Sequence, residues 1–450
     1  MGSYYRKIPD GFLPAIGHRK DLHGNRGQSI IMNILQVNKF HYIRGGAEVV
    51  YFSTADILKR YGHRVVFFSI QNPNNLTCEY SSYFMPYIDL ENTDSVINKV
   101  KAAGRIFYSF EARKRLSRLL DRYPVDIAHL HSISHYISPS ILHELKQRKI
   151  PVVMSLHEFK VVCASYYFLV DGKSCEACRG GKYFMVIKNR CVRESLAKSI
   201  LCATEMYLHN KVLDIYRNVD LFISTSLFQK SKLIEMGFNK EMVYLPNFID
   251  IQKFRQFNTA VESESAKNNR YIIYIGRLSS EKGLFTLLEA AKLISRGNKE
   301  IEIKMSGDGP IREKLQEKVK AEKINNVRFL GYIKHEDLCQ EIKNSLAVVL
   351  PSECYENNPV SVMEAFAMGV PLIGARIGGI PELVRNNETG LTFEPGDSKD
   401  LASKIEYMAN NPDEAAEMGE KARAFVEQEL NAEKHYQKLM EIYKRVIRRS

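Results

Sequence analysis

The stretch that decides the fold is LPSECYENNPVSVMEAFAMGVPLIGARIGGIPE, residues 350–382. The apolar residues 347–350 lead into it and have the composition of a buried parallel strand. Asn358 is suited to cap a helix over residues 360–368, and a second strand is expected over residues 371–375. The stretch therefore predicts a strand, a loop, a helix and a strand, which is the repeating unit of an α/β fold.

Two carboxylates flank the start of the predicted helix. Glu356 lies in the loop at the carboxyl end of a strand, and Glu364 lies inside the helix after seven intervening residues. Ligands of open α/β sheets bind at the carboxyl ends of the strands, and a helix N-terminus there favours a phosphate. Carboxylates do not bind phosphate, but they accept hydrogen bonds from sugar hydroxyls. The alternative is that both are solvated glutamates beside a helix start.

The pair Glu356-x7-Glu364, followed by the sequence GGIPE at residues 378–382, resembles the signature of the retaining glycosyltransferase family 4. Members of this family, the glycosyl transferases group 1, have the GT-B fold. It consists of two Rossmann-like, doubly wound parallel-sheet domains that face a central cleft, and the donor is a nucleotide-diphosphate sugar. The resemblance implies that Glu356 contacts the donor sugar and that Glu364 contacts the ribose.

One departure from the family pattern concerns the loop after the first glutamate. The family often has Glu-Gly-Phe-Gly, whereas this chain has Glu356-Asn357-Asn358-Pro359. Proline removes one backbone N–H group that would otherwise face the sugar. We expect Asn357 and Asn358 to form part of the donor-binding loop.

Arg277 and Lys282 lie between a predicted strand, residues 271–275, and the next helix. Two fixed cations there can take the charge that grows on a leaving nucleoside diphosphate, so no catalytic metal is expected. They match the paired Arg and Lys of the family. Other residues expected at the donor site are Gly276 and Gly307, each at a strand-to-helix turn, and Tyr332 and Ile333, which the resemblance places beside the nucleobase.

The N-terminal half carries weaker signals for the same site. Gly45 and Gly46 lie between a strand and a helix, where glycine lets the backbone approach a phosphate or sugar closely. They match the N-terminal glycine loop of the family in type and position. His157, directly after the strand over residues 152–156, resembles the family's active-site histidine, and His131 is a weaker candidate.

Cys163, Cys175, Cys178 and Cys191 are separated by eleven, two and twelve residues. Four thiolates of this kind suit a closed tetrahedral Zn²⁺ site, so we predict a structural zinc. The alternative is a set of unpaired buried thiols. The loop over residues 163–191 is also rich in aromatic residues, and it is a candidate for shaping the acceptor site.

The length of 450 residues predicts two domains, and 45% hydrophobic with 26% charged residues is ordinary for a soluble globular protein. No apolar run approaches the roughly 20 residues of a membrane span, and no signal-peptide core is present, so a cytoplasmic protein is expected. The predicted parts are a flexible extension (1–31), an N-terminal acceptor domain (32–250), a nucleotide-sugar-binding domain (251–430), and a last helix that packs back toward the first domain (431–450).

The net charge of +12 lies entirely in residues 1–250, which hold 34 Lys and Arg against 22 Asp and Glu. This bias predicts an anionic partner, and no nucleic-acid-binding motif is present. A basic helix is expected over residues 106–123. It is either a packed surface helix or one that docks on a membrane. Its charged residues are Arg105, Arg113, Lys114, Arg115, Arg118 and Arg122, and its apolar ones are Ile106, Phe107, Phe110, Leu116, Leu119 and Leu120.

These observations predict a retaining glycosyltransferase that moves a sugar from a nucleotide diphosphate to an acceptor hydroxyl. The acceptor expected is a lipid-linked glycan in surface polysaccharide assembly, with the enzyme bound peripherally to the inner face of the cell membrane. The alternatives are a soluble acceptor, a GT-B sugar-nucleotide epimerase or phosphorylase, and a non-catalytic nucleotide-sugar binder.

Overall fold

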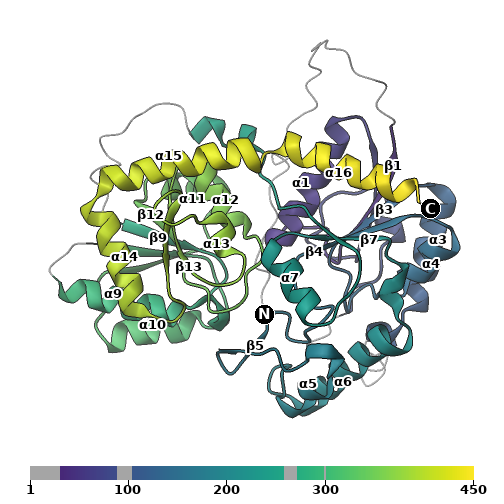
Figure 1. Cartoon of the computed structure of the whole chain (residues 1–450), viewed down its shortest axis with the longest axis horizontal. Helices are drawn as coiled ribbons and strands as arrows, with labels where there is room; N and C mark the ends of the chain where they lie inside the picture. Colours follow the sequence, from purple (N-terminus) through teal and green to yellow (C-terminus); the bar gives the residue numbers. More distant parts are fainter. Residues whose placement is uncertain (1–30, 89–103, 258–270, 298–300, 450) are drawn as a thin grey trace, which may run out of the picture. The chain divides into compact units, whose positions relative to one another are not determined.

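The computed structural model describes residues 31–88, 104–257, 271–297 and 301–449 (Figure 1). The predicted extension thus lies outside the described residues, apart from Ile31. Contacts divide the chain into two compact units. Unit 1 comprises the described residues of Met1–Ser155, Val212–Phe222 and Glu441–Ser450, and unit 2 those of Leu156–Lys211 and Ile223–Met440. This division differs from the predicted domain boundaries, because residues 156–211 belong to unit 2 and the cut runs through the last helix.

The first sheet takes its strands from residues 33–244. The elements of this part are β1 (Asn33–Val37), α1 (Gly46–Arg60), β2 (Arg64–Phe68), η2 (Ser81–Tyr83), α3 (Phe110–Arg122), β3 (Ile127–Leu130), α4 (Ile141–Gln147), β4 (Val152–Leu156), β5 (Leu169–Val170), β6 (Lys173–Ser174), η3 (Arg179–Gly181), α5 (Phe184–Lys188), α6 (Leu196–Tyr207), η4 (Leu208–Val212), η5 (Ile215–Asn218), β7 (Leu221–Ser224), α7 (Leu227–Glu235), β8 (Met242–Tyr244) and η6 (Ile251–Phe257).

The second sheet takes its strands from residues 271–393, and helices follow it to the end. The elements are β9 (Tyr271–Ile275), η7 (Ser280–Lys282), α9 (Leu284–Arg296), β10 (Glu302–Ser306), α10 (Arg312–Ala321), β11 (Val327–Gly331), α11 (His335–Lys343), β12 (Ala347–Leu350), α12 (Val360–Ala367), β13 (Leu372–Ala375), α13 (Ile380–Leu383), β14 (Gly390–Phe393), α14 (Ser398–Asn410), α15 (Pro412–Glu429) and α16 (Ala432–Ile447).

Both sheets have six strands in a doubly wound order, which confirms the predicted fold class of two Rossmann-like parallel sheets. The first has the order β2-β1-β3-β4-β7-β8 and the second β11-β10-β9-β12-β13-β14. All five neighbouring pairs of the second sheet are parallel. Its strand order reverses between β9 and β12, and such a switch point is where α/β sheets bind ligands.

The core of unit 2 follows from the spacing of apolar residues in α9. Leu284, Leu287, Leu288, Ala291 and Ile294 recur at intervals of three or four, so they line one face of the helix, and all are fully buried. They pack with apolar residues of β9, β10 and β12 and with Leu401 and Ile405 of α14. Burial of this face fixes α9 on the sheet, and with it the loop that leads from β9 into the helix.

The predicted basic helix over residues 106–123 is interrupted. Residues 104–107 are helical, residues 108 and 109 are not, and α3 begins at Phe110. The break arises because the side chain of Ser109 accepts a hydrogen bond from the backbone N–H of Ala112 and so caps a new helix start.

The apolar side of α3 is turned into unit 1. Leu116, Leu119 and Leu120 are buried, and Phe110 is the one large apolar residue of α3 that is exposed. Three of the six basic residues are also engaged within the unit. Arg105 and Arg115 bind Glu111, and Arg113 binds Glu144 of α4. An apolar face inserted into a bilayer, as the sequence predicted for membrane docking, is therefore not available on this helix.

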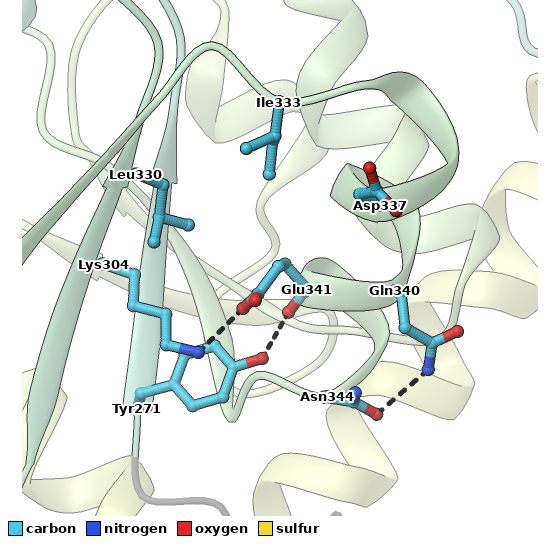
Figure 2. Close-up of a pocket in the computed structure, with 8 residues that line it drawn as sticks. All are labelled: Tyr271, Lys304, Leu330, Ile333, Asp337, Gln340, Glu341 and Asn344. Atoms are coloured by element: carbon cyan, nitrogen blue, oxygen red, sulfur yellow. Dashed lines mark hydrogen bonds and ion pairs between the residues drawn. The ribbon is translucent and has the colours of Figure 1, made fainter.

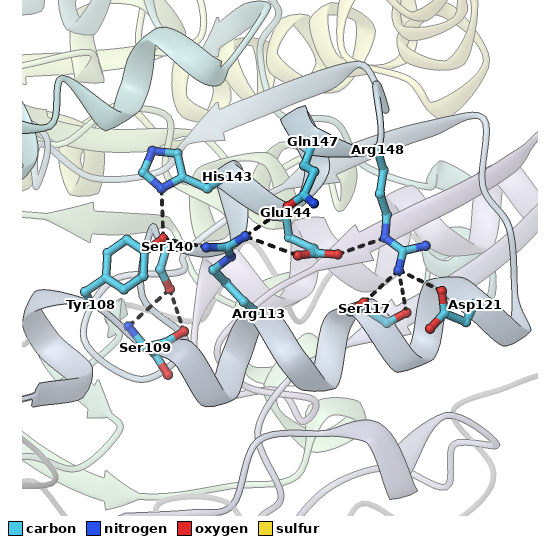
Figure 3. A network of polar contacts seen from close by, with 10 residues as sticks. All are labelled: Tyr108, Ser109, Arg113, Ser117, Asp121, Ser140, His143, Glu144, Gln147 and Arg148. Carbon is cyan, nitrogen blue, oxygen red and sulfur yellow. Dashed lines mark hydrogen bonds and ion pairs between the residues drawn. The ribbon is translucent and has the colours of Figure 1, made fainter.

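A polar network joins α3 to α4 (Figure 3). Its centre is Glu144, whose carboxylate pairs with Arg113 at 3.5 Å and with Arg148 at 2.9 Å. Arg148 in turn binds Asp121 and Ser117, both at 2.7 Å. The Glu144 side chain is 10% exposed and that of Asp121 is 63% exposed. Glu144 thus stabilises two partly buried arginines, whereas Asp121 adds one exposed pair.

We expect Glu144→Ala to lower the free energy of unfolding by about 1–3 kcal/mol, because it removes the largely buried carboxylate that the guanidinium groups of Arg113 and Arg148 share. Asp121→Ala is the matched control and should cost under about 1 kcal/mol, because the pair that it removes is exposed. Urea unfolding followed by circular dichroism measures both. Equal losses in the two variants would contradict the central role of Glu144.

Candidate active site

The two loops that carry most of the predicted donor residues follow neighbouring strands of the second sheet. The loop after β9 holds Arg277, which is exposed, and Lys282, which ends the turn η7. The loop after β12 holds Glu356 and leads into α12. Because β9 and β12 are parallel neighbours, both loops leave the same edge of the sheet at the switch point.

An ion pair joins these loops. The Nζ atom of Lys282 lies 2.5 Å from Oε1 of Glu356, and the hydroxyl of Ser352 donates to the same oxygen at 2.7 Å. Burial disfavours both charges, but the pairing outweighs it: the pKa of Glu356 is lowered by Lys282 and Ser352, and the pKa of Lys282 is raised by Glu356. The ammonium and the carboxylate are therefore both held in their charged forms.

Glycines bring other backbone segments against this site. Gly379 donates its N–H to the carbonyl of Glu356 at 2.7 Å. A Cβ on Gly379 would lie 1.9 Å from the carbonyl oxygen of Asn357, and one on Gly307 would lie 1.9 Å from that of Gly276. Gly276 and Gly307 thus meet at the carboxyl ends of β9 and β10. A side chain at Gly307 or Gly379 would push these loops apart.

Glu364 lies in the second turn of α12 and is half-buried. Burial raises the pKa of Glu364 to about 7, and no cation among the described residues offsets this effect. Pro359, the N-cap residue of α12, offers no side-chain hydrogen bond to the first turn, in which the N–H of Val362 donates to the Pro359 carbonyl at 3.2 Å. The site thus presents a carboxylate and a helix N-terminus that a ligand can complete.

The prediction that Asn358 caps α12 is wrong. The N-cap residue is Pro359, and the helix runs from Val360 to Ala367. The Oδ1 atom of Asn358 instead accepts from the N–H of Asn247, whose own amide donates to the Asn358 carbonyl at 2.7 Å. The loop at Asn358 thus makes two hydrogen bonds to Asn247 in place of a single capping bond to α12.

Asn357 connects the same loop to the predicted catalytic histidine. Its side-chain amide donates to the carbonyl oxygen of His157 at 2.9 Å, while its Oδ1 is buried without a hydrogen-bond partner. His157 directly follows β4 and is half-buried. The structure therefore brings the backbone of His157 against Asn357, the neighbour of Glu356, within unit 2.

Tyr355, next to Glu356, is held by contacts that the sequence did not predict. Its hydroxyl donates to Glu176 at 2.9 Å, and the same carboxylate oxygen accepts from Lys232 at 2.8 Å. The Tyr355 ring also lies 4.9 Å from that of Phe228 and 5.7 Å from that of Phe168. The residue before the predicted sugar contact is thus fixed by the cysteine-containing segment and by α7.

Glu382, the last residue of GGIPE, caps a helix. Its two carboxylate oxygens accept hydrogen bonds from the backbone N–H groups of Leu227 and Phe228 at 2.9 and 2.6 Å, at the start of α7. A carboxylate is favourable at a helix N-terminus. The motif could be recognised in the sequence, but this role could not, because the partners are more than 150 residues away.

Two predictions concern residues of unit 1. Gly45 precedes α1 and Gly46 is its first residue. His131 is buried, and its Nε2 atom lies 2.9 Å from Oε1 of Gln36, while its ring stacks on that of His129 at 4.4 Å. This packing gives His131 a structural role in the unit.

A pocket of about 380 Å³ lies between the second sheet and α11 (Figure 2). Lys304 crosses its floor, with its Nζ atom 3.6 Å from the centre of the Tyr271 ring and 2.8 Å from the carboxylate of Glu341. Of the predicted donor residues only Ile333 lines it, and Tyr332 is exposed nearby in the chain. Because Tyr271 is the first residue of β9, the pocket reaches toward the end of the strand opposite Arg277.

The four cysteines of the predicted zinc site gather in one region of unit 2. Burial and the neighbouring thiols of Cys163, Cys191 and Cys175 raise the pKa of Cys178 to about 12. All eight cysteines of the chain are free thiols. Among the described residues the four do not form a group whose ligand atoms all lie within 4.8 Å of one another.

Comparison with known families agrees with this architecture. The model of "Glycosyltransferase Family 4" matches residues 44–253, and that of "Glycosyl transferases group 1" matches residues 256–425. The chain belongs to glycosyltransferase family 4.

Several relatives of this family 4 glycosyltransferase are known by sequence. N-acetyl-alpha-D-glucosaminyl L-malate synthase of Bacillus anthracis is 24% identical over 413 residues, 90% of this chain and 95% of the relative. A capsular polysaccharide biosynthesis glycosyltransferase of Staphylococcus aureus, CapM, is 25% identical over 63% of this chain and 71% of the relative. A match at 29% identity to alpha-D-kanosaminyltransferase of Streptomyces kanamyceticus covers 34% of this chain and only 39% of the relative.

Solved structures share the fold of this glycosyltransferase at low identity. Anabaena HepE, crystallised with UDP and glucose, superposes with a TM-score of 0.63 at 17% identity, over 92% of this chain and 99% of that protein. The GT-B fold that the sequence predicted is thus the fold of the structural neighbours as well.

We expect Glu364→Gln to stabilise the folded protein at pH 8. A carboxylate with a pKa of about 7 when folded and 4.5 when unfolded destabilises the folded state above pH 7 by up to about 3 kcal/mol, and this cost fades as pH falls to 4.5. The melting temperature of the variant should therefore exceed that of the wild type at pH 8 and match it near pH 4.5. A gap that does not change with pH would contradict the raised pKa.

Proposed function

We propose that this glycosyltransferase is retaining and uses a nucleotide-diphosphate sugar. Arg277, Lys282 and the first-turn N–H groups of α12 hold the diphosphate, Glu364 binds the ribose hydroxyls, and Glu356 and His157 bind the transferred sugar. The observation that carries the proposal is the Lys282–Glu356 pair, in which a cation lies beside the carboxylate that we propose to bind the sugar, at the switch point. A structure of the neighbour HepE in complex with UDP-glucose supports the same ligand class.

The reaction proposed is a displacement on one face of the sugar. The bond from the anomeric carbon to the diphosphate oxygen breaks, and a bond to the acceptor oxygen forms on the same face. The acceptor proton passes to the leaving phosphate oxygen. Arg277 and Lys282 stabilise the negative charge that develops on the diphosphate, so the protein itself supplies the cations and no divalent metal takes part in the chemistry.

The acceptor that we propose is a lipid-linked glycan of surface polysaccharide assembly. Its support is the name of the capsular relative and the excess positive charge of residues 1–250. No described helix is long and apolar enough to cross a bilayer. Since the apolar side of α3 is buried, attachment would depend on the exposed cations Lys114, Arg118 and Arg122 at the cytoplasmic face of the membrane.

Arg277→Ala should lower the rate of sugar transfer by about 100-fold or more at saturating donor, because Arg277 meets charge that develops in the transition state. Arg296→Ala, an exposed arginine at the end of α9, is the matched control and should retain full activity. Release of the nucleoside diphosphate from a panel of nucleotide sugars measures the rate, first with and then without EDTA.

Four outcomes separate the alternatives for this reaction. Full activity of Arg277→Ala would contradict the donor site, and activity that EDTA abolishes and Mg²⁺ restores would contradict the metal-free chemistry. An inverted anomeric configuration in the product, read by NMR, would contradict the retaining mechanism. Thermal stabilisation by UDP without any transfer would favour a non-catalytic binder.

We expect Lys114→Glu/Arg118→Glu/Arg122→Glu to reduce co-sedimentation with vesicles that contain anionic phosphatidylglycerol. Each cation near such a surface contributes about 1 kcal/mol, and the attraction weakens as salt rises. The control Lys314→Glu/Lys320→Glu/Lys323→Glu changes the charge equally on and after α10 and should still bind. Equal sedimentation of the wild type with anionic and neutral vesicles at low salt would favour a soluble acceptor.

A further inference from the structure

The segment that carries the four predicted zinc ligands has little regular structure. We call residues 159–194 the cysteine lobe. It contains two strands of two residues, β5 and β6, one turn of 3-10 helix and the five-residue helix α5. A segment of this length with so few backbone hydrogen bonds of its own needs another constraint to stay in one conformation.

The lobe also concentrates unfavourable backbone geometry. Twelve described residues other than glycine have a positive φ, and six of them lie between residues 166 and 194. Such a conformation costs roughly 1–2 kcal/mol per residue and persists only where the surroundings enforce it. The six are Tyr166 (73°), Phe168 (53°), Asp171 (49°), Arg190 (44°), Arg193 (53°) and Glu194 (56°).

The four thiols are interspersed with these strained positions. Cys163 precedes Tyr166, Cys175 ends the β5–β6 hairpin through its N–H bond to the Phe168 carbonyl at 2.7 Å, and Cys191 lies between Arg190 and Arg193. Cys178 contacts the small apolar cluster of Val186, Cys202 and Met206 together with Cys191. A link between the four sulfurs would therefore fix both ends and the middle of the lobe.

We propose that Cys163, Cys175, Cys178 and Cys191 bind one structural Zn²⁺ ion. Four thiolates are the ligand set of a closed tetrahedral zinc site, and binding requires their side chains to turn inward and release four protons to solvent. The zinc tetrathiolate would carry a net charge of −2. Seven Lys and Arg against three Asp and Glu in the lobe offset it, and the amide of Asn189 lies 3.6 Å from the Cys175 sulfur as a donor to a thiolate.

The zinc site would also support the active site without taking part in catalysis. Glu176 directly follows Cys175 and accepts a hydrogen bond from the hydroxyl of Tyr355, the neighbour of Glu356. The N–H of Gly180 donates to the Met236 carbonyl at the end of α7 at 3.0 Å. The metal would thus fix the surface against which the loop after β12 packs. This inference does not depend on the identity of donor or acceptor.

The test measures zinc in full-length protein purified without metal-affinity resin. We expect about one Zn²⁺ per chain by inductively coupled plasma mass spectrometry. The Cys178→Ser variant should contain no more zinc than the buffer blank. Cys78→Ser, which removes a thiol far from the lobe in sequence, is the matched control and should keep its zinc. Replacement of Zn²⁺ by Co²⁺ should give the absorption spectrum of tetrahedral thiolate coordination.

A readout on the wild type covers the case in which Cys178→Ser does not fold. Stripping zinc with a mercurial and a chelator should loosen the backbone around Arg179, Lys182 and Lys188, whose side chains are exposed, so that trypsin cleaves there, and added Zn²⁺ should restore protection after the thiols are reduced. Zinc far below one per chain with four reactive thiols would overturn the proposal. So would a Cys175–Cys178 disulfide, seen as a mass 2 Da lower, or zinc that Cys178→Ser retains.

Discussion

The ion pair between Lys282 and Glu356 is the contact on which the rest of the site depends. It joins loops 74 residues apart in the chain, and both partners are largely removed from water. A buried pair of this kind contributes little to stability because desolvation opposes the attraction. Its value is geometric: it holds a cation and an acceptor of hydroxyl hydrogen bonds at fixed positions where two parallel strands end. The close approach of Gly379 to Asn357 and of Gly307 to Gly276 makes that geometry possible.

The loop that carries Glu356 is held in one conformation by hydrogen bonds to several distant segments. Asn357 donates to the segment after β4, Asn358 is bound by Asn247, and Tyr355 is bound by Glu176. None of these bonds lies within the strand–loop–helix unit itself. A site on a loop reaches the precision of one on a helix only when its supporting contacts are as well defined as the functional groups. Substitutions in the supporting segments should therefore affect donor binding without touching the donor.

The sequence predicted the strands and helices that depend on a local pattern of residues. It did not predict side-chain roles that are set by hydrogen bonds to distant parts of the chain. The strand over 347–350 and the helix from Val360 were predicted correctly because the apolar pattern of neighbouring residues indicates both. The cap by Asn358 was wrong because Asn247, 111 residues away, takes its side chain. The sequence left open whether α3 packs on the protein or docks on a membrane, since periodicity shows that α3 has an apolar side but not what covers it. The role of Glu382 was beyond prediction because α7 lies elsewhere in the chain.

Two buried or half-buried carboxylates differ in how the folded chain neutralises them. In unit 1, Glu144 is largely buried and two arginines neutralise it, as expected of a carboxylate that serves stability. Glu364 is half-buried with no such partner among the described residues, and burial raises its pKa to about 7, so its ionisation opposes folding as pH rises. A ribose that donates two hydroxyls would supply the missing hydrogen bonds, and the first-turn N–H groups of α12 would find theirs in a phosphate. Under the proposed function, nucleotide binding would recover the free energy that these groups do not contribute to folding.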